Sequence, residues 1–109
     1  MVSYFVRYRG AASDPAAFLR YYEAHHSAIL CKFPGIRSLT LHLPISWNDP
    51  FPVRAGGSAL VAQMQFESGA DLNAALQSSA RVLARDDFHH FPAFDGEVTH
   101  EAMAGTVVF

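Results

Sequence analysis

The sequence has little that would tie it to a membrane, to nucleic acid or to an oxidising compartment. Its 8 basic and 10 acidic residues are scattered along 109 positions, so no basic stripe exists to follow a phosphate backbone. No apolar run approaches the roughly 18 residues that cross a bilayer. The single cysteine, Cys31, cannot form an internal disulfide, and residues 2–8 alternate where a signal peptide would be continuously apolar. We therefore expect a cytoplasmic protein that binds neither nucleic acid nor membranes.

The patterns that are present predict one domain of mixed α and β structure. Half of the residues are apolar, enough for one core, so we expect a single domain over residues 1–109. Alternation predicts four strands, at residues 2–8, 35–43, 58–66 and 96–103. A helix is predicted over residues 14–33, because aspartate followed by proline favours a helix start and a later proline and glycine end it.

A second helix is predicted from Ser68, which has the spacing of a capping box to Asp71. The residues that this helix would bury are Leu72, Ala75, Leu76, Ala80 and Leu83. A short helical turn is expected between Asp86 and Phe91, ahead of the last strand.

The resulting order, β-α-β-β-α-β, predicts a ferredoxin-like α+β fold with a four-stranded antiparallel sheet. Two helices can cover only one face of such a sheet. The strand over residues 58–66 has apolar residues at both parities, for example Leu60 and Val61. Because an exposed apolar face is a sticky patch on a monomer, we expect a homodimer in which sheet faces sheet.

The helix over residues 14–33 contains two adjacent histidines that point in different directions. At 100° per residue the buried stripe includes Phe18 and Tyr22, and His26 lies at its edge, facing the sheet. His25 lies on the opposite margin, where we expect a structural role. An imidazole with a pKa near ~6.5 can accept and return a proton close to neutral pH. His26 is therefore a candidate general base or acid, and the alternative is a space-filling ring bonded to a carbonyl.

The segment RDDFHHFPAFDG, residues 85–96, combines carboxylates, imidazoles and phenylalanines. Such groups can bind zinc or iron, but no pair has the spacing of a metal site, so we expect no metal. Asp87 is a candidate to orient His26 across a cleft. Asp86 is expected to form a surface ion pair with a neighbouring arginine, and Phe91 to lie in the core or a pocket wall.

Residues 44–57, PISWNDPFPVRAGG, form a connection that three prolines and two glycines keep irregular. The loop is longer than usual, which favours a functional segment. Trp47, Phe51 and Arg54 combine flat apolar surface with a polar handle, as a lid over a small pocket would. The alternative is packing of the loop on its own subunit or across a dimer.

Residues 18–36, FLRYYEAHHSAILCKFPGI, resemble the first helix of the EthD-like family of ferredoxin-like, dimeric α/β-barrel proteins. The positions that match are Phe18, Tyr22, His26, Pro34 and Gly35. The stretches MQFESGADLNAALQSS and DDFHHF are similar to later family patterns. Ala28 stands where the family usually has proline, which implies that a local helix bend is absent here.

The resemblance implies small-molecule catabolism without a cofactor, because related dimeric barrels include lactone isomerases, polyketide cyclases and cofactor-free monooxygenases. We expect an isomerase, cyclase, lyase or monooxygenase-like enzyme in which His26 transfers a proton on a small hydrophobic or aromatic-derived compound. Tyr22 and Asp87 would orient the imidazole. The residues expected to bind the substrate are Trp47, Phe51, Arg54 and Phe91. The alternative is a dimer without catalytic turnover: either a module that binds a small ligand or haem, or a stress-associated structural protein.

Overall fold

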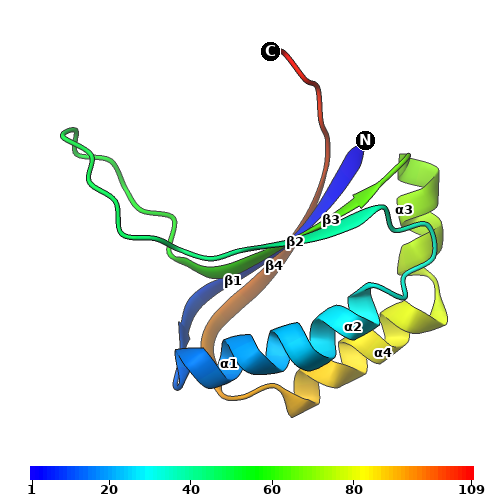
Figure 1. Cartoon of the computed structure of the whole chain (residues 1–109), viewed down its shortest axis with the longest axis horizontal. Coiled ribbons are helices and arrows are strands. Elements are labelled where there is room, and N and C mark those ends of the chain that lie inside the picture. Colours follow the sequence, from blue (N-terminus) through cyan, green and yellow to red (C-terminus); the bar gives the residue numbers. More distant parts are fainter.

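The computed structural model describes residues 1–109 as one antiparallel sheet with helices on one of its faces (Figure 1). The strands are β1 (Val2–Ala12), β2 (Ser38–His42), β3 (Ser58–Phe66) and β4 (Phe94–Ala104). They lie side by side in the order β2-β3-β1-β4, and all neighbours are antiparallel. The predicted ferredoxin-like α+β fold is confirmed.

The helical layer consists of two stretches, residues 15–30 and 69–90, which lie below the sheet in the view of Figure 1 except at the start of the second, which stands beside the right-hand end of the sheet. Its elements are α1 (Pro15–Tyr21), the π-helical turn η1 (Tyr22–His26), α2 (Ser27–Leu30), α3 (Gly69–Leu76), α4 (Ser79–Asp87) and the 3₁₀ turn η2 (Phe88–His90). The Asp14 carboxylate caps α1 by accepting from the Ala17 N–H at 3.1 Å. Ser68 caps α3 in the same way, accepting from the Asp71 N–H at 3.2 Å, as the spacing predicts.

The second predicted helix is wrong as one continuous element, because it breaks after Leu76. Gln77 leaves the helical region, and Ser78 begins α4 by accepting from the Arg81 N–H at 3.4 Å. The break turns the second half of the segment, so Leu83 is 51% exposed although the continuous pattern would bury it. Ala84 takes the buried position instead.

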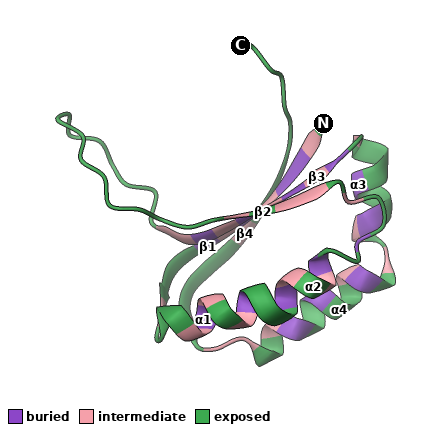
Figure 2. Cartoon of the chain, in the orientation of Figure 1, coloured by how far each residue is buried: buried purple, intermediate pink, exposed green.

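The core lies between this helical layer and the inward face of the sheet (Figure 2). The buried strand residues alternate along β1 and β3, as a half-covered sheet requires. Tyr8 lies at the centre, fully buried, with its ring edge-on to Phe18 and Tyr22 at 5.6 Å between centroids in each case. The core thus holds the first helical stretch against β1.

The outward face of the sheet is less apolar than the sequence suggests. Phe5, Val61 and Met103 lie there among polar side chains, and Gln63 donates to the Ser3 hydroxyl at 3.1 Å. The loop between β2 and β3 and the C-terminal tail project away from the helices (Figure 1). None of the helices combines the length and apolar character that crossing a membrane requires.

Candidate functional site

Three side chains from the two helical stretches meet in a hydrogen-bonded chain beneath the sheet. His26 Nδ1 lies 2.9 Å from Asp87 Oδ2, and the Tyr21 hydroxyl donates to Asp87 Oδ1 at 2.6 Å. The imidazole is only 2% exposed and the aspartate 8%. The carboxylate therefore receives one donor on each oxygen, which fixes the position of the histidine that it faces.

The π-helical turn η1 explains why Tyr21 and His26 reach the same carboxylate. In a regular α-helix, residues five apart point about 140° away from each other. Here the Ser27 N–H donates to the Tyr22 carbonyl, the five-residue bond of a π-helix, which widens the turn. Residues five apart then share a face. Ala28 stands where the family usually has a helix-bending proline, and in this chain the helix is irregular at the π-turn just before it. Such π-turns are frequent at functional sites.

The electrostatics of the pair select one protonation state. Burial lowers the pKa of His26, and the hydrogen bond and charge of Asp87 oppose this shift without reversing it. Burial alone would raise the pKa of Asp87, but the hydrogen bonds from Tyr21 and His26 outweigh it and hold that pKa below its ordinary value. The aspartate is thus an ionised acceptor at neutral pH, and the neutral imidazole must carry its proton on Nδ1. Nε2 then keeps its lone pair.

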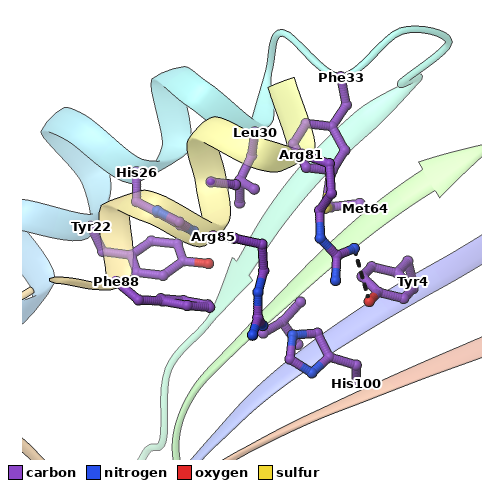
Figure 3. A pocket seen from close by; sticks show the side chains of 12 residues that line it. Tyr4, Tyr22, His26, Leu30, Phe33, Met64, Arg81, Arg85, Phe88 and His100 are labelled. Atoms are coloured by element: carbon purple, nitrogen blue, oxygen red, sulfur yellow. Dashed lines mark hydrogen bonds between the residues drawn. The ribbon is translucent and has the colours of Figure 1, made fainter. Parts of the chain in front are cut away.

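His26 borders a cavity between the helices and the sheet (Figure 3). The cavity holds about 20 Å³, roughly one water molecule, and about 310 Å³ when the space open to solvent is included. Its inner wall is apolar, formed by Val6, Leu30, Phe33 and Met64. The structure gives Nε2 no protein hydrogen bond. A basic nitrogen therefore faces an apolar void, which is the arrangement that proton transfer needs.

Tyr22 contacts the imidazole through its ring, which packs against His26 at 4.9 Å between centroids. Its hydroxyl is buried next to that of Tyr8 and makes no hydrogen bond to His26. Figure 3 shows this hydroxyl pointing into the cavity. Burial raises the pKa of Tyr22, so the group remains a donor. The hydrogen bond to Asp87 comes from Tyr21, which is not among the site residues predicted from the sequence.

The remaining predicted site residues divide between the site and the long loop. Phe91 lies edge-on to His26 at 4.8 Å between centroids, and is part of the wall around the imidazole. Trp47, Phe51 and Arg54 are exposed on the loop between β2 and β3, and none of them lines the His26 cavity of its own chain. Within one chain this loop is not a lid over the imidazole.

The site has no metal-ligand cluster: nowhere in the chain do three or more histidine, cysteine, aspartate or glutamate side chains gather to hold an ion. His25 is exposed, with its ring against Tyr21 at 4.9 Å between centroids, so the two adjacent histidines diverge. Cys31 is an exposed free thiol at the end of α2.

Solved structures share this fold at low sequence identity. A protein of the ethyl tert-butyl ether D (EthD) family from Bacillus halodurans has a TM-score of 0.78 and 19% identity, over 97% of this chain and 99% of that one. SnoaB, a cofactor-independent oxygenase from Streptomyces nogalater, has a TM-score of 0.63 and 16% identity, over 98% and 94%. A dimeric ferredoxin-like protein of unknown function from Thermobifida fusca has 0.65 and 9%, over 94% and 89%.

No family model matches the sequence, and no curated protein does. The chain is thus similar to EthD-family and oxygenase structures in its fold. What it does must be argued from its own side chains.

The lowered pKa of His26 predicts how stability depends on pH. The unfolded chain takes up a proton near ~6.5, whereas folded His26 takes it up only at lower pH, so stability is complete above ~6.5 and is lost as pH falls. His100, whose pKa burial also lowers, contributes in the same direction. Urea titrations between about pH 7.5 and about pH 5.5 should show this loss. His26→Gln, whose amide can still donate to Asp87, should make the slope shallower.

The matched control is His25→Gln, which alters the exposed neighbour and should leave the slope as in the wild type. An unchanged slope in His26→Gln would mean that the buried imidazole does not titrate as the geometry requires.

Proposed function

We propose that the chain is an enzyme of small-molecule metabolism in which His26 moves a proton on a small, largely apolar substrate. The observation that carries this proposal is the neutral imidazole that is bonded to Asp87 through Nδ1, has no protein hydrogen bond at Nε2 and borders a largely apolar cavity. A merely structural histidine would have both nitrogens satisfied by the protein or lie against solid packing. The similarity in fold to an EthD-family protein and to a cofactor-independent oxygenase supports the same class of function.

The arrangement supports proton abstraction next to a carbonyl group. Nε2 of His26 takes a proton from the substrate carbon, and the electron pair of the broken C–H bond moves onto the carbonyl oxygen as an enolate. The Asp87 carboxylate stabilises the imidazolium that forms, because the two groups lie 2.9 Å apart away from water. The Tyr22 hydroxyl, which lines the cavity and stays protonated, donates to the enolate oxygen. Return of the proton to another atom of the substrate completes an isomerisation.

Tyr21 acts as a positioning residue in this mechanism. Its hydroxyl holds the second oxygen of Asp87 at 2.6 Å, and this hydrogen bond raises the pKa of Tyr21 to about 12, so the hydroxyl remains a donor. Phe88 and Phe91 pack on the faces and edge of the imidazole and exclude water from it. The aromatic wall therefore keeps the proton between the imidazole and the substrate.

We also propose that the protein works as a homodimer. The outward sheet face carries Phe5, Val61 and Met103, and the tail exposes Val108 and Phe109 almost completely. A second copy of the chain would cover these apolar groups. It would also give Trp47, Phe51 and Arg54 a place to contribute to binding, since they reach out from the loop and away from their own helices. The structure of similar fold from Thermobifida fusca is described as dimeric.

Removing the base should remove the reaction. The test is exchange of the carbon-bound protons next to the ketone of 3-benzoylpropionate and its methyl ester for solvent deuterium, followed by NMR. We expect wild-type protein to accelerate exchange of at least one probe, and His26→Gln to lower that rate by about 10²-fold or more. Tyr21→Phe should lower it less, because the carboxylate remains.

His25→Gln is the matched control and should keep the wild-type rate. Exchange with neither probe above the buffer rate, or an unchanged rate in His26→Gln, would overturn the catalytic proposal.

The dimer is tested by light scattering on the purified protein. The mass should be about 24 kDa, twice the 12.0 kDa of one chain. Val61→Glu, on the outward sheet face, should shift it to one chain, because an interface would bury the charge unpaired. Val82→Glu, on the exposed side of α4, should remain a dimer. A wild-type mass of one chain at high concentration would contradict the proposal.

A further inference from the structure

We propose that the cavity takes a small organic carboxylate with an apolar body, and that Arg81 and Arg85 hold its anionic group at the mouth between α4 and β4. This inference rests on the proposed function, because it names the substrate class of the same site. It arises from charged groups that the proton-transfer mechanism leaves unused.

Arg81 and Arg85 are one helical turn apart on α4 and both line the His26 cavity (Figure 3). The ion pairs of the chain are the surface pairs Arg9–Glu97 and Arg37–Glu67, and the Asp87 carboxylate is bonded to the neutral His26. Neither cavity arginine is in one of them, and the ion pair expected for Asp86 is not formed. Two guanidinium charges thus lie at the mouth of an apolar cavity without a carboxylate from the protein.

Both guanidinium groups are held in place by aromatic rings and not by acids. Arg81 Nη1 donates to the Tyr4 hydroxyl at 3.2 Å, and its Cζ lies 5.7 Å from the centre of that ring. The Cζ of Arg85 lies 5.1 Å from the centre of the Phe88 ring. Stacking of this kind leaves the positive charge uncompensated and most N–H donors without a partner. Two such guanidinium groups can donate hydrogen bonds to the two oxygens of one carboxylate.

The pKa of His100 on β4 is sensitive to the positive charge at this mouth. Its ring lies 5.9 Å from the Tyr4 ring between centroids and lines the same cavity. Burial lowers the pKa of His100, and the positive charges of Arg81 and Arg85 lower it further. No carboxylate is among the groups that act on it. A bound anion would supply the charge that this mouth lacks.

The apolar body has a place beside the cavity. A groove of about 460 Å³ runs between η2 and β4, lined by Tyr8, Phe18, Phe91, Phe94 and Val98. It shares Arg85, Phe88 and His100 with the His26 cavity, so Arg85 lies where the two spaces meet and Arg81 lies one helical turn away in the cavity. A ligand with its ring in the groove and its carboxylate against the two arginines places the chain between them, which carries the carbonyl group, at the opening of the His26 cavity. The ligand class is thus an aryl or alicyclic keto acid.

The experiment measures binding by calorimetry for three probes: 3-benzoylpropionate, its methyl ester and acetate. We expect the carboxylate to bind at least about tenfold tighter than the ester, which lacks the charge, and than acetate, which lacks the apolar body. Arg81→Gln with Arg85→Gln should remove the preference for the acid over the ester. Arg20→Gln with Arg37→Gln lowers the net charge equally, away from the cavity, and should keep it.

Two outcomes would overturn the inference: equal affinity for the acid and the ester, or a preference for the acid that survives in the Arg81/Arg85 double variant. If acetate bound as tightly as the keto acid, the groove would contribute nothing to binding, and an apolar body would not be part of the ligand class. An NMR titration of His100 gives an independent reading, because bound carboxylate should raise its pKa in the wild type.

The His26→Gln variant separates this inference from the proposed function. Selective binding of the acid by a variant that no longer exchanges protons supports both. His26-dependent exchange without any preference for the acid would refute the carboxylate site and leave the base in place. Selective binding with an exchange rate that His26→Gln does not change would refute the base and leave the carboxylate site.

Discussion

The site depends on the Asp87 carboxylate, which lies between Tyr21 and His26 and accepts a hydrogen bond from each. Because these donors come from the first helical stretch and Asp87 ends α4, the same contact ties the two helical stretches together and sets the protonation of the imidazole. An ionised carboxylate can only accept, so the neutral ring must donate from Nδ1. The chemistry proposed for Nε2 follows from this one constraint.

Around that contact, the fold places apolar side chains on one side of the cavity and charged side chains at its opening. The sheet supplies the apolar floor of the cavity through Val6 and Met64, and Phe88 of η2 and Phe91, which follows η2, pack against His26. The only strongly polar groups at the opening are Arg81, Arg85 and His100, from α4 and β4. Small-molecule sites commonly combine an apolar wall with a few oriented polar groups. The base and the cations then act on different parts of one ligand.

The sequence predicts the order of elements and the inward position of His26, and the reasons are local. Alternation marks residues 58–66 as β3 with its observed bounds, and Ser68 caps α3 as its spacing indicates. The π-turn has no sequence signature, and regular helical spacing of 100° per residue would not bring Tyr21 to the carboxylate that His26 contacts. The helix break near Ser78 likewise moved Leu83 to the surface. Contacts between segments far apart in the sequence depend on how the helices pack on the sheet. An example is the cavity that Arg85 of α4 and His100 of β4 both line, which residue spacing alone could not predict.

The most direct test of this account is the tautomer of His26 at neutral pH, measured from the ¹⁵N chemical shifts of its two ring nitrogens. The account predicts a protonated Nδ1 and a bare Nε2, because the ionised Asp87 accepts from the first and burial keeps the ring neutral. A proton on Nε2, or a ring charged at both nitrogens, would contradict it.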